Sequence, residues 1–519
     1  MSAGKVENGS GVGRSRLPDG WAWATLDDLA EVAGGVTKDA KRQSDPSLPG
    51  VPYLRVANVQ RMKLDLGEVA TIRVPADAVE RYRLQPGDVL MTEGGDRDKL
   101  GRGWVWEGQI DTCIHQNHVF RARITGSAIE PKLLALYLNS VARPWLEANA
   151  KQSVNLASIS ISKIKQLPVA VPPIAEQQRI AVVLDAHLAR LDAIEAKLSA
   201  ALEHLDALQN STMAAAATGL IDPKAVPASS PTSPDADLDS GALPELAKGW
   251  RWSRLSDIAE VVGGVTKDSK RQADEALPEV PYLRVANAQR ARLDLSQVTK
   301  IRVPAKTLSK LRLESGDLLL TEGGDRDKLG RGWIWEDQIE DCIHQNHLFR
   351  ARIQHAITQP KLLAWYTNSA ARGWFESHAK QSVNLASISM SKVRNLPVPI
   401  PPQAEQLEAV AAGERSLGHL TVLAELTRQA VAHTATLRRV LLADAFSGCL
   451  VPQDPADEPA EDLLKRIRVE REIAEAERKA ARKAARSRAK AAAPVSAARR
   501  DDTTLADGEQ TTLPLEFNS

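Results

Sequence analysis

Three sets of residues in this chain have the types that catalysis or binding requires, and each set occurs twice. The first is Thr92–Trp104 (TEGGDRDKLGRGW), an acidic, basic and glycine-rich segment that recurs without change as Thr321–Trp333. The second is Cys113–His118 (CIHQNH), which recurs as Cys342–His347. The third consists of Lys and Arg residues in loops. These residue types suit a metal-dependent nuclease, a zinc site and a nucleic-acid surface, respectively.

The acidic residues of the first set form a poor catalytic centre. Glu93, Asp96 and Asp98 lie within one loop rather than on two strands, and the glycines around them predict a shaped turn. The chain has no GxxxxGK[ST], no GxGxxG after a strand, no HExxH and no GxSxG. It also lacks the Asp/Asn-Pro-Pro-aromatic tetrapeptide of amino-methyltransferases. We therefore assign no catalytic residue, and a stand-alone nuclease or methyltransferase is the alternative hypothesis.

The Cys/His set could supply three zinc ligands, Cys113, His115 and His118, whereas a structural zinc site normally has four. In a strand, Cys113 and His115 would share a face that His118 would not, because successive side chains alternate. We therefore predict no metal site. Gln116 and Asn117 are expected to stabilise a turn or to contact a partner.

The basic loops favour nucleic-acid binding. Phosphates require cations, while base edges require planar donors and acceptors such as Arg, Asn, Gln and Asp. Glycines in the same loops let a ligand approach the backbone closely. Ordinary solvated charges would have the same composition, and the identity of the loops in both copies is also compatible with a recent duplication. The candidate DNA-binding residues are Lys38, Lys41, Arg42, Arg61, Lys63, Asp96, Arg97, Lys99, Arg102, Gln116, Asn117, Lys267, Lys270, Arg271, Arg290, Arg292, Asp325, Arg326, Lys328, Arg331, Gln345 and Asn346.

These loops must be positioned by a domain that the sequence contains twice. An offset of 229 residues joins Trp21 to Trp250 and Gly219 to Gly448, so about 200 residues are repeated. A repeat of this length is a domain with its connector rather than a solenoid unit. Short strand-like runs separated by Gly, Pro and Asp, followed by helical runs, predict an α+β domain over residues 17–173 and again over 249–402.

A long helix is predicted after each domain, over residues 174–221 and 403–450. The first has Leu every seven residues and no Gly or Pro from 175 to 217, which indicates a coiled-coil seam of roughly 60 Å. Burial of a single helix in a globular core is the alternative. The second helix has a less regular repeat. The predicted seam residues are Leu184, Leu191, Leu198, Leu205, Leu420, Leu423, Leu437 and Leu441.

The remaining segments have simpler compositions. Residues 1–16 and 491–519 are expected to be disordered, and 222–248 to be a linker rich in Pro, Ser and Asp. Residues 451–490 are expected to contain a charged helix, either solvated or used for docking or DNA-backbone contact; from Lys465 to Lys490 it has eleven Lys/Arg and four Glu.

The bulk composition predicts a soluble cytoplasmic protein. Of the 519 residues, 43% are hydrophobic and 26% are charged. The sequence has neither a membrane-spanning apolar run nor a secretory h-region. Its three cysteines form no disulfide framework. The net charge of +1 neither supports nor excludes a nucleic-acid partner.

The order of these parts resembles the specificity subunits of type I restriction–modification systems. Each predicted long helix begins after a Pro-Pro pair, with AEQQ at Ala175–Gln178 and AEQ at Ala404–Gln406. The segment KQSVNLASIS, at Lys151–Ser160 and Lys380–Ser389, resembles the family's junction between domain and helix. GDVL and GDLL resemble the strand before its recognition loop, and Glu461–Glu472 (EDLLKRIRVERE) resembles its C-terminal extension. The resemblance covers about residues 17–475.

The resemblance implies a fold and a function. Two tandem α+β DNA-recognition domains would alternate with two long helices that pair as an antiparallel coiled coil. Each domain would read one half of a bipartite double-stranded DNA target, and the chain would have no catalytic activity or cofactor of its own. Two modification subunits would bring S-adenosylmethionine, and motor-nuclease subunits that use ATP and Mg²⁺ would join some complexes, in a prokaryotic cytoplasm. Because the domains are nearly identical, we expect a palindromic or nearly palindromic target. A coiled-coil adaptor in another defence complex is a further alternative.

Overall fold

A computed structural model of the chain describes residues 16–96, 99–153, 156–222, 224–227, 243–381 and 385–491. Most of both predicted disordered termini, Arg97 and much of the predicted linker therefore lie outside the described residues. Residue contacts divide the chain into two units, Met1–Leu188 with Arg438–Ser519, and Ala189–Leu437. Each unit thus contains one repeated domain and one end of each long helix. None of the described helices is long and apolar enough to cross a membrane.

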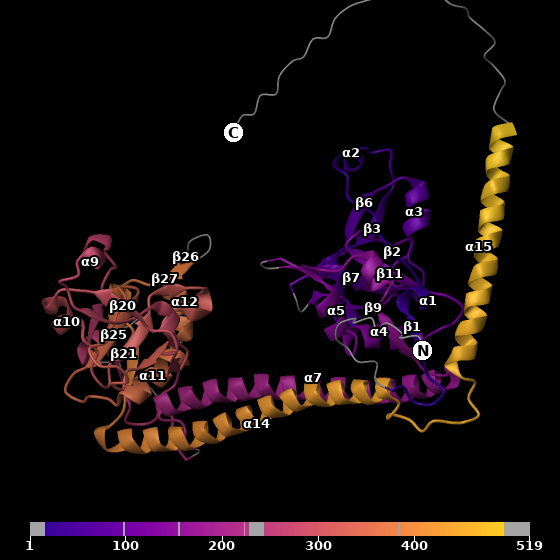
Figure 1. Cartoon of the computed structure of the whole chain (residues 1–519). Coiled ribbons are helices and arrows are strands. Elements are labelled where there is room, and N and C mark those ends of the chain that lie inside the picture. The colour runs from indigo at the N-terminus through magenta and orange to yellow at the C-terminus, as the bar shows by residue number, and fades with distance from the viewer. Residues whose placement is uncertain are drawn as a thin grey trace, which may run out of the picture. The chain divides into compact units, whose positions relative to one another are not determined.

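The main sheet of the first domain is antiparallel and is covered by a buried helix (Figure 1). Its strand order is β2 (Ala30–Gly34), β11 (Val119–Ile124), β7 (Val89–Thr92) and β9 (Gly103–Val105). Helix α4 (Pro131–Asn139) packs against β7 and β9, with every residue from Leu133 to Asn139 buried. Pro occupies the first turn of this helix, where no intrahelical N–H is needed.

A second sheet gives the domain a second, smaller core. Strand β3 (Gly50–Leu54) pairs with β6 (Ala70–Arg73) in antiparallel fashion and with β10 (Ile114–His115) in parallel fashion. Elsewhere, β1 (Ala22–Thr25) pairs with β14 (Pro168–Val171) and so closes the domain immediately before the long helix. The other elements are α1 (Leu26–Leu29), α2 (Ala40–Gln43), η1 (Val56–Asn58), β4 (Val59–Gln60), β5 (Lys63–Leu64), α3 (Ala76–Tyr82), β8 (Gly94–Gly95), α5 (Arg143–Asn149), β12 (Lys151–Gln152), β13 (Ala157–Ser158) and α6 (Ile161–Ile164).

The second domain repeats these sheets with the same neighbours. Its main sheet has the order β16-β25-β21-β23, and its smaller sheets are β20-β17-β24, β22-β27-β26 and β15-β28. Its elements are β15 (Arg251–Arg254), α8 (Leu255–Ile258), β16 (Ala259–Gly263), α9 (Ser269–Ala273), β17 (Glu279–Leu283), η3 (Val285–Asn287), β18 (Ala288–Gln289), β19 (Arg292–Leu293), β20 (Thr299–Arg302), α10 (Ala305–Leu311), β21 (Leu318–Thr321), β22 (Gly323–Gly324), η4 (Arg326–Lys328), β23 (Gly332–Ile334), β24 (Ile343–His344), β25 (Leu348–Ile353), α11 (Pro360–Asn368), α12 (Arg372–His378), β26 (Lys380–Gln381), β27 (Ala386–Ser387), α13 (Met390–Arg394) and β28 (Pro397–Ile400).

The two long helices are α7 (Ile174–Thr218) and α14 (Gln406–Ser447), the latter preceded by η5 (Gln403–Glu405). In the first unit, Leu184 near the start of α7 shares a core with Phe446 at the end of α14. In the second unit the opposite ends meet, since a Cβ at Gly413 of α14 would lie 3.1 Å from the Cβ of Ala216 in α7. The helices therefore pair in antiparallel fashion, as predicted.

The predicted seam is correct for α7 and partly wrong for α14. Leu184 and Leu205 are buried, and Leu191 and Leu198 are half-buried, as are Leu420 and Leu441 of α14. Leu423 and Leu437, in contrast, are 50% and 57% exposed.

The buried row of α14 instead contains small and hydroxyl residues. Ala424, Thr427 and Thr434 lie on it, with exposed fractions of 4%, 9% and 5%. Each threonine hydroxyl donates to a backbone carbonyl of the preceding turn, at 2.7 Å in both cases, so its burial leaves no unpaired donor. Counting only leucines therefore placed the seam on the wrong residues.

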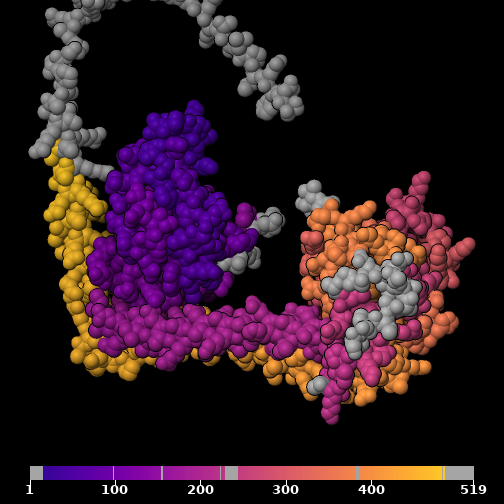
Figure 2. Space-filling model, turned by 180° about the vertical axis from the view of Figure 1, so that it is seen from behind, coloured from indigo at the N-terminus to yellow at the C-terminus, as the bar shows by residue number. Residues whose placement is uncertain are grey.

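The charged C-terminal helix α15 (Ala460–Ala491) belongs to the first unit (Figure 2). Leu463, Leu464 and Ile467 of its first two turns are buried in the core of that unit. The Arg471 guanidinium donates to the Asp27 carbonyl further along. The start of this helix is therefore packed on its own unit. The sequence had predicted only a helix that is solvated or used for docking or DNA-backbone contact.

Candidate nucleic-acid interface

The two most distinctive repeated motifs form one small sheet. Strand β8, within the loop TEGGDRDKLGRGW, pairs with β13 of the segment KQSVNLASIS, and β13 pairs with β12. A Cβ at Gly94 would lie 2.2 Å from the Ala157 carbonyl oxygen, so a larger residue there would force the strands apart. The Ile159 N–H also donates to the Glu93 carbonyl at 3.0 Å. The structure thus brings together two segments that are more than 50 residues apart, which sequence reasoning treated separately.

The turn Gln116–His118 connects this loop to the other repeated segments. The Gln116 N–H donates to the Leu54 carbonyl at 2.9 Å, and the Asn117 N–H donates to the Val36 carbonyl at 3.0 Å. The Gln116 side chain accepts a hydrogen bond from the Val56 N–H at 3.3 Å. Gln116 and Asn117 therefore stabilise a turn, which is one of the two roles that the sequence left open; contact with a partner stays a prediction. The same bonds hold Gln345 and Asn346 in the second domain, to Leu283, Val265 and Val285.

Several candidate arginines stabilise the loops through hydrogen bonds from their guanidinium groups to backbone carbonyls. Arg102 donates to the Val56 carbonyl at 3.3 Å, and Arg61 donates to the Asn139 carbonyl at 3.2 Å. In the second domain Arg290 donates to the Asn368 and Asp327 carbonyls. Burial lowers the pKa values of Arg290 and Arg331. These arginines hold the surface together in addition to giving it positive charge.

The loop acids pair with cations. The Lys99 ammonium contacts the Asp96 carboxylate, and Lys328 contacts Asp325 in the same way. The hydrogen bond from the lysine lowers the pKa of each aspartate. The described residues contain no group of three or more His, Cys, Asp or Glu that could hold a metal ion. Neither the nuclease nor the zinc interpretation gains support from this arrangement.

The side chains of the Cys/His segment separate, but a turn rather than strand alternation is the reason, because β10 ends at His115 and His118 lies in the turn that follows. Burial raises the pKa of the Cys113 thiol to about 12 and lowers the pKa of His115 to about 4. The His115 Nδ1 bonds to the Val119 carbonyl at 2.7 Å, whereas the exposed His118 bonds to Glu93. The three side chains therefore do not converge on one ion.

The residues around α2 form a separate part of the surface. Arg42 donates to the Thr37 carbonyl at 3.3 Å, and Asp39 accepts from the Arg42 N–H at 2.9 Å. Figure 1 shows α2 beyond β6, at the end of the first domain opposite α7. This cluster is therefore not part of the β8–β13–β12 sheet. Candidate residues with exposed side chains are Lys38, Lys41, Lys63, Asp96, Lys267, Lys270, Arg292, Asp325 and Arg326, and those with half-buried side chains are Arg42, Arg61, Lys99, Arg102, Gln116, Asn117, Arg271, Arg290, Lys328, Arg331, Gln345 and Asn346.

Sequence reasoning missed two features of this surface. Lys151 and Gln152 are exposed on β12, although they were noted only as part of a junction. His118 forms a 2.6 Å pair with Glu93 from 25 residues away, and only its repetition in both copies gave a signal.

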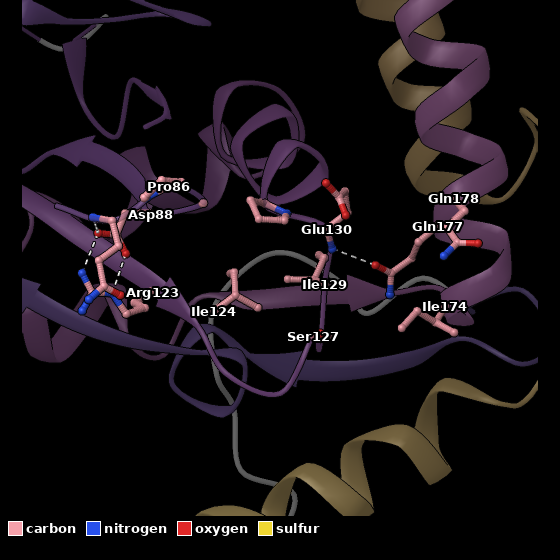
Figure 3. A pocket seen from close by; sticks show the side chains of 13 residues that line it. Pro86, Asp88, Arg123, Ile124, Ser127, Ile129, Glu130, Ile174, Gln177 and Gln178 are labelled. Atoms are coloured by element: carbon pink, nitrogen blue, oxygen red, sulfur yellow. Dashed lines mark hydrogen bonds and ion pairs between the residues drawn. The ribbon is translucent and has the colours of Figure 1, made fainter. Parts of the chain in front are cut away.

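The junction between domain and long helix is a separate, structural site. Figure 3 shows a cavity of about 540 Å³ in the first unit, with the Asp88–Arg123 ion pair on one side and Gln177 of α7 on the other. Both bonds of the ion pair measure 2.7 Å, and the Gln177 side chain accepts from the Glu130 N–H at 2.9 Å. Trp21 also donates to Glu176 at 3.0 Å, as Trp250 does to Glu405 at 2.9 Å. These bonds fix the start of each long helix to its domain.

Comparison with known proteins agrees with this geometry. The family model described as the type I restriction modification DNA specificity domain matches residues 18–204. The type I restriction enzyme StySPI specificity subunit of Salmonella potsdam is 24% identical over 485 residues, which cover 89% of this chain and 98% of that protein. The EcoKI specificity subunit of Escherichia coli (strain K12) is 24% identical over 499 residues, which cover 91% of this chain and 97% of that protein.

A solved structure shares the fold. It is a chain from a study of complex assembly and conformational transition in a type I R-M system, and its TM-score is 0.63 at 17% identity. The match covers 84% of this chain and 100% of that chain. Residues 18–204, the first domain with much of α7, match a DNA specificity domain of type I restriction modification systems. Over 89% and 91% of its length the chain is similar to specificity subunits of type I restriction enzymes.

Proposed function

We propose that this chain is the DNA-reading subunit of a type I restriction–modification complex, with a targeting role and no chemical step of its own. Each α+β domain binds one half of a bipartite double-stranded target, and the paired helices separate the two halves. The observation that carries this proposal is the convergence of the repeated polar segments on one surface of each domain. Exposed Lys and Arg around that surface supply phosphate contacts, and its amides, carboxylates and arginines supply contacts to base edges.

The near-identity of the two surfaces supports an inverted repeat as the target. The loop Thr92–Trp104 is unchanged at Thr321–Trp333, and both copies make the same backbone bonds. Two like domains related by a two-fold axis read like half-sites in opposite orientation. The hairpin of β4 and β5 differs from that of β18 and β19, with Met62-Lys63 in one copy and Ala291-Arg292 in the other. A one-base difference between the halves would arise there.

The partners and cofactors belong to the same proposal. Two modification subunits, which bind S-adenosylmethionine, dock on the long helices, and motor-nuclease subunits bring ATP and Mg²⁺. An apolar row on α14 supports docking there, because Val422, Leu423 and Leu426 are 61%, 50% and 56% exposed. Replacing Val422 and Leu426 with Ser should weaken assembly with the modification subunits without changing the fold. Gln429→Ser, on the same helix, is the control and should leave assembly unchanged. Unchanged assembly in the double variant would remove this row as the docking surface.

The central experiment combines methylation mapping with matched variants. Sites methylated in cells that carry the whole system should show two like half-sites in inverted orientation. Arg326→Ala or Asp325→Ala should relax recognition of one half-site, and Asp96→Ala that of the other. A lost base contact costs about 1–3 kcal/mol. Unrelated half-sites would contradict the palindrome, and binding that ignores sequence in the wild type would contradict the DNA-reading role itself.

A further inference from the structure

A histidine–glutamate pair lies on the reading surface of both domains. The His118 Nδ1 is 2.6 Å from Glu93 Oε2, and the His347 Nδ1 is 2.6 Å from Glu322 Oε2. The histidine side chains are 56% and 55% exposed, and the glutamates are both 29% exposed. Packing does not require an imidazole at this position, in contrast to His115, which is fully buried. The pair is therefore available to a ligand.

The glutamate determines which ring nitrogen carries the proton. An ionised carboxylate only accepts hydrogen bonds, so the imidazole must donate from Nδ1. In the neutral ring Nε2 then carries a lone pair. The Asn117 Nδ2 lies 3.4 Å from this nitrogen and donates to it in this tautomer. Nε2 is therefore a hydrogen-bond acceptor, and a base amino group that binds it takes the place of the Asn117 amide.

The backbone holds this pair in a fixed place between two recognition segments. The Glu93 N–H donates to the His118 carbonyl at 2.9 Å, and the Glu322 N–H donates to the His347 carbonyl at 3.0 Å. Glu93 is followed directly by β8, and His118 ends the turn that carries Gln116 and Asn117. The acceptor therefore lies where the glycine-rich loop and the amide-bearing turn meet.

We propose that His118 and His347 each read an exocyclic amino group in the major groove, adenine N6 or cytosine N4, through the Nε2 lone pair. Glu93 and Glu322 are the positioning residues that hold the acceptor tautomer. This inference rests on the proposed DNA-reading function. The amino groups of adenine and cytosine are the only hydrogen-bond donors that base edges present in the major groove, so an acceptor there selects where the amino group lies.

The test is a double-mutant cycle that combines removal of the histidine with removal of the base amino group. The affinity of the full-length chain with its modification subunits is measured for duplexes with single replacements in one half-site. In each duplex one adenine is replaced by purine, or one cytosine by its analogue without the 4-amino group. At one position the wild type should lose roughly 5–150-fold in affinity, the equivalent of about 1–3 kcal/mol. His118→Ala should lose a similar amount on the natural duplex and nothing more on the analogue. His347→Ala should behave in the same way at the symmetry-related position of the other half-site.

Further variants separate reading from structure. Glu93→Ala should reduce discrimination at that same position without changing affinity for unrelated DNA, and Glu93→Gln, which keeps a hydrogen bond to Nδ1, should retain part of it. His187→Ala, on an exposed position of α7, should change nothing. If His118→Ala lost the same affinity on every duplex, His118 would contact phosphates or support the fold, and the proposal would be overturned. So would full discrimination in His118→Ala, or DNA cleavage by the purified chain that this variant abolishes.

Equal binding of the wild type to the natural and analogue duplexes would also overturn the proposal. A wild type that binds unrelated sequences as tightly as the natural target would instead refute the DNA-reading function. The two failures are therefore distinguishable.

Discussion

The two units carry the same proposed DNA-reading surface in different surroundings. In the second unit the end of α7 meets the start of the second domain, where the Ala247 N–H donates to the Thr218 carbonyl at 2.9 Å. In the first unit the end of α14 packs on the first domain, with Phe446 in edge contact with Tyr137 at 5.2 Å between centroids. The first unit then receives α15, whose Ala460 N–H donates to the Gly20 carbonyl at 2.8 Å. Each domain is thus completed by the helix that follows the other one.

This difference separates the elements that form the proposed DNA-reading surface from an element that stabilises one unit only. The bonds that form the reading surface come from segments that are present in both copies, from Val36 to Ile159 and from Val265 to Ile388. Helix α15 contributes Leu463, Leu464 and Ile467 to the first core and has no repeated counterpart. Changes to the shared elements should therefore act on both units alike, and changes to α15 on one unit alone.

The largest expected effect is a loss of folding stability at acidic pH, and it should be equal in both units. His115 and His344 are fully buried, their Nε2 atoms have no partner among the described residues, and burial lowers both pKa values to about 4. In the unfolded chain a histidine has a pKa near 6.5. Between pH 6.5 and pH 4 the unfolded chain therefore binds more protons than the folded chain, and the free energy of unfolding falls as the pH drops through this range. Each unit should lose about 3 kcal/mol by pH 4.

Urea unfolding followed from pH 7 to pH 4 measures this loss. His115→Gln should reduce the pH dependence of the first unit and leave that of the second unchanged. An equal pH dependence in the wild type and the variant would show that other groups cause the acid sensitivity.

The next effect should break the symmetry between the units. Leu464→Ala removes a side chain that is 5% exposed in the first core and should cost that unit about 2–4 kcal/mol. The second unit should unfold as before. Val469→Ala, at a site on the same helix that is 55% exposed, is the control and should change stability by about 0.5 kcal/mol or less. Equal destabilisation of both units would contradict the assignment of α15 to the first.

The smallest effect should distinguish one turn of the two copies. Met62 lies between β4 and β5 and Ala291 between β18 and β19, and both have a positive φ, of 58° and 56°. Ala291→Gly should stabilise the second unit by about 0.5–1 kcal/mol, because glycine adopts this conformation without steric cost. Met62→Gly should gain less, because both residues pack against the core of their unit and Met62 would lose a larger apolar side chain there than Ala291. Calorimetry of both variants tests this, and a larger gain for Met62→Gly would refute the explanation.

The sequence by itself determined the duplication and the fold class. Repetition at a fixed offset and heptad leucines in α7 are local patterns, which follow from backbone geometry and can be read without coordinates. Alternation from Cys113 was not such a pattern, because β10 contains only Ile114 and His115 and a turn places His118.

Only the tertiary structure decided which residues are partners. The seam of α14 uses Thr427 rather than Leu423, because the rotation of a helix against its partner depends on packing along its whole length. His118 finds Glu93 because β8 and the turn after β10 meet in space. Leu464 is buried because α15 folds back on the first domain. Contacts between distant segments depend on the free energy of the assembled core, and no short stretch of sequence contains that information.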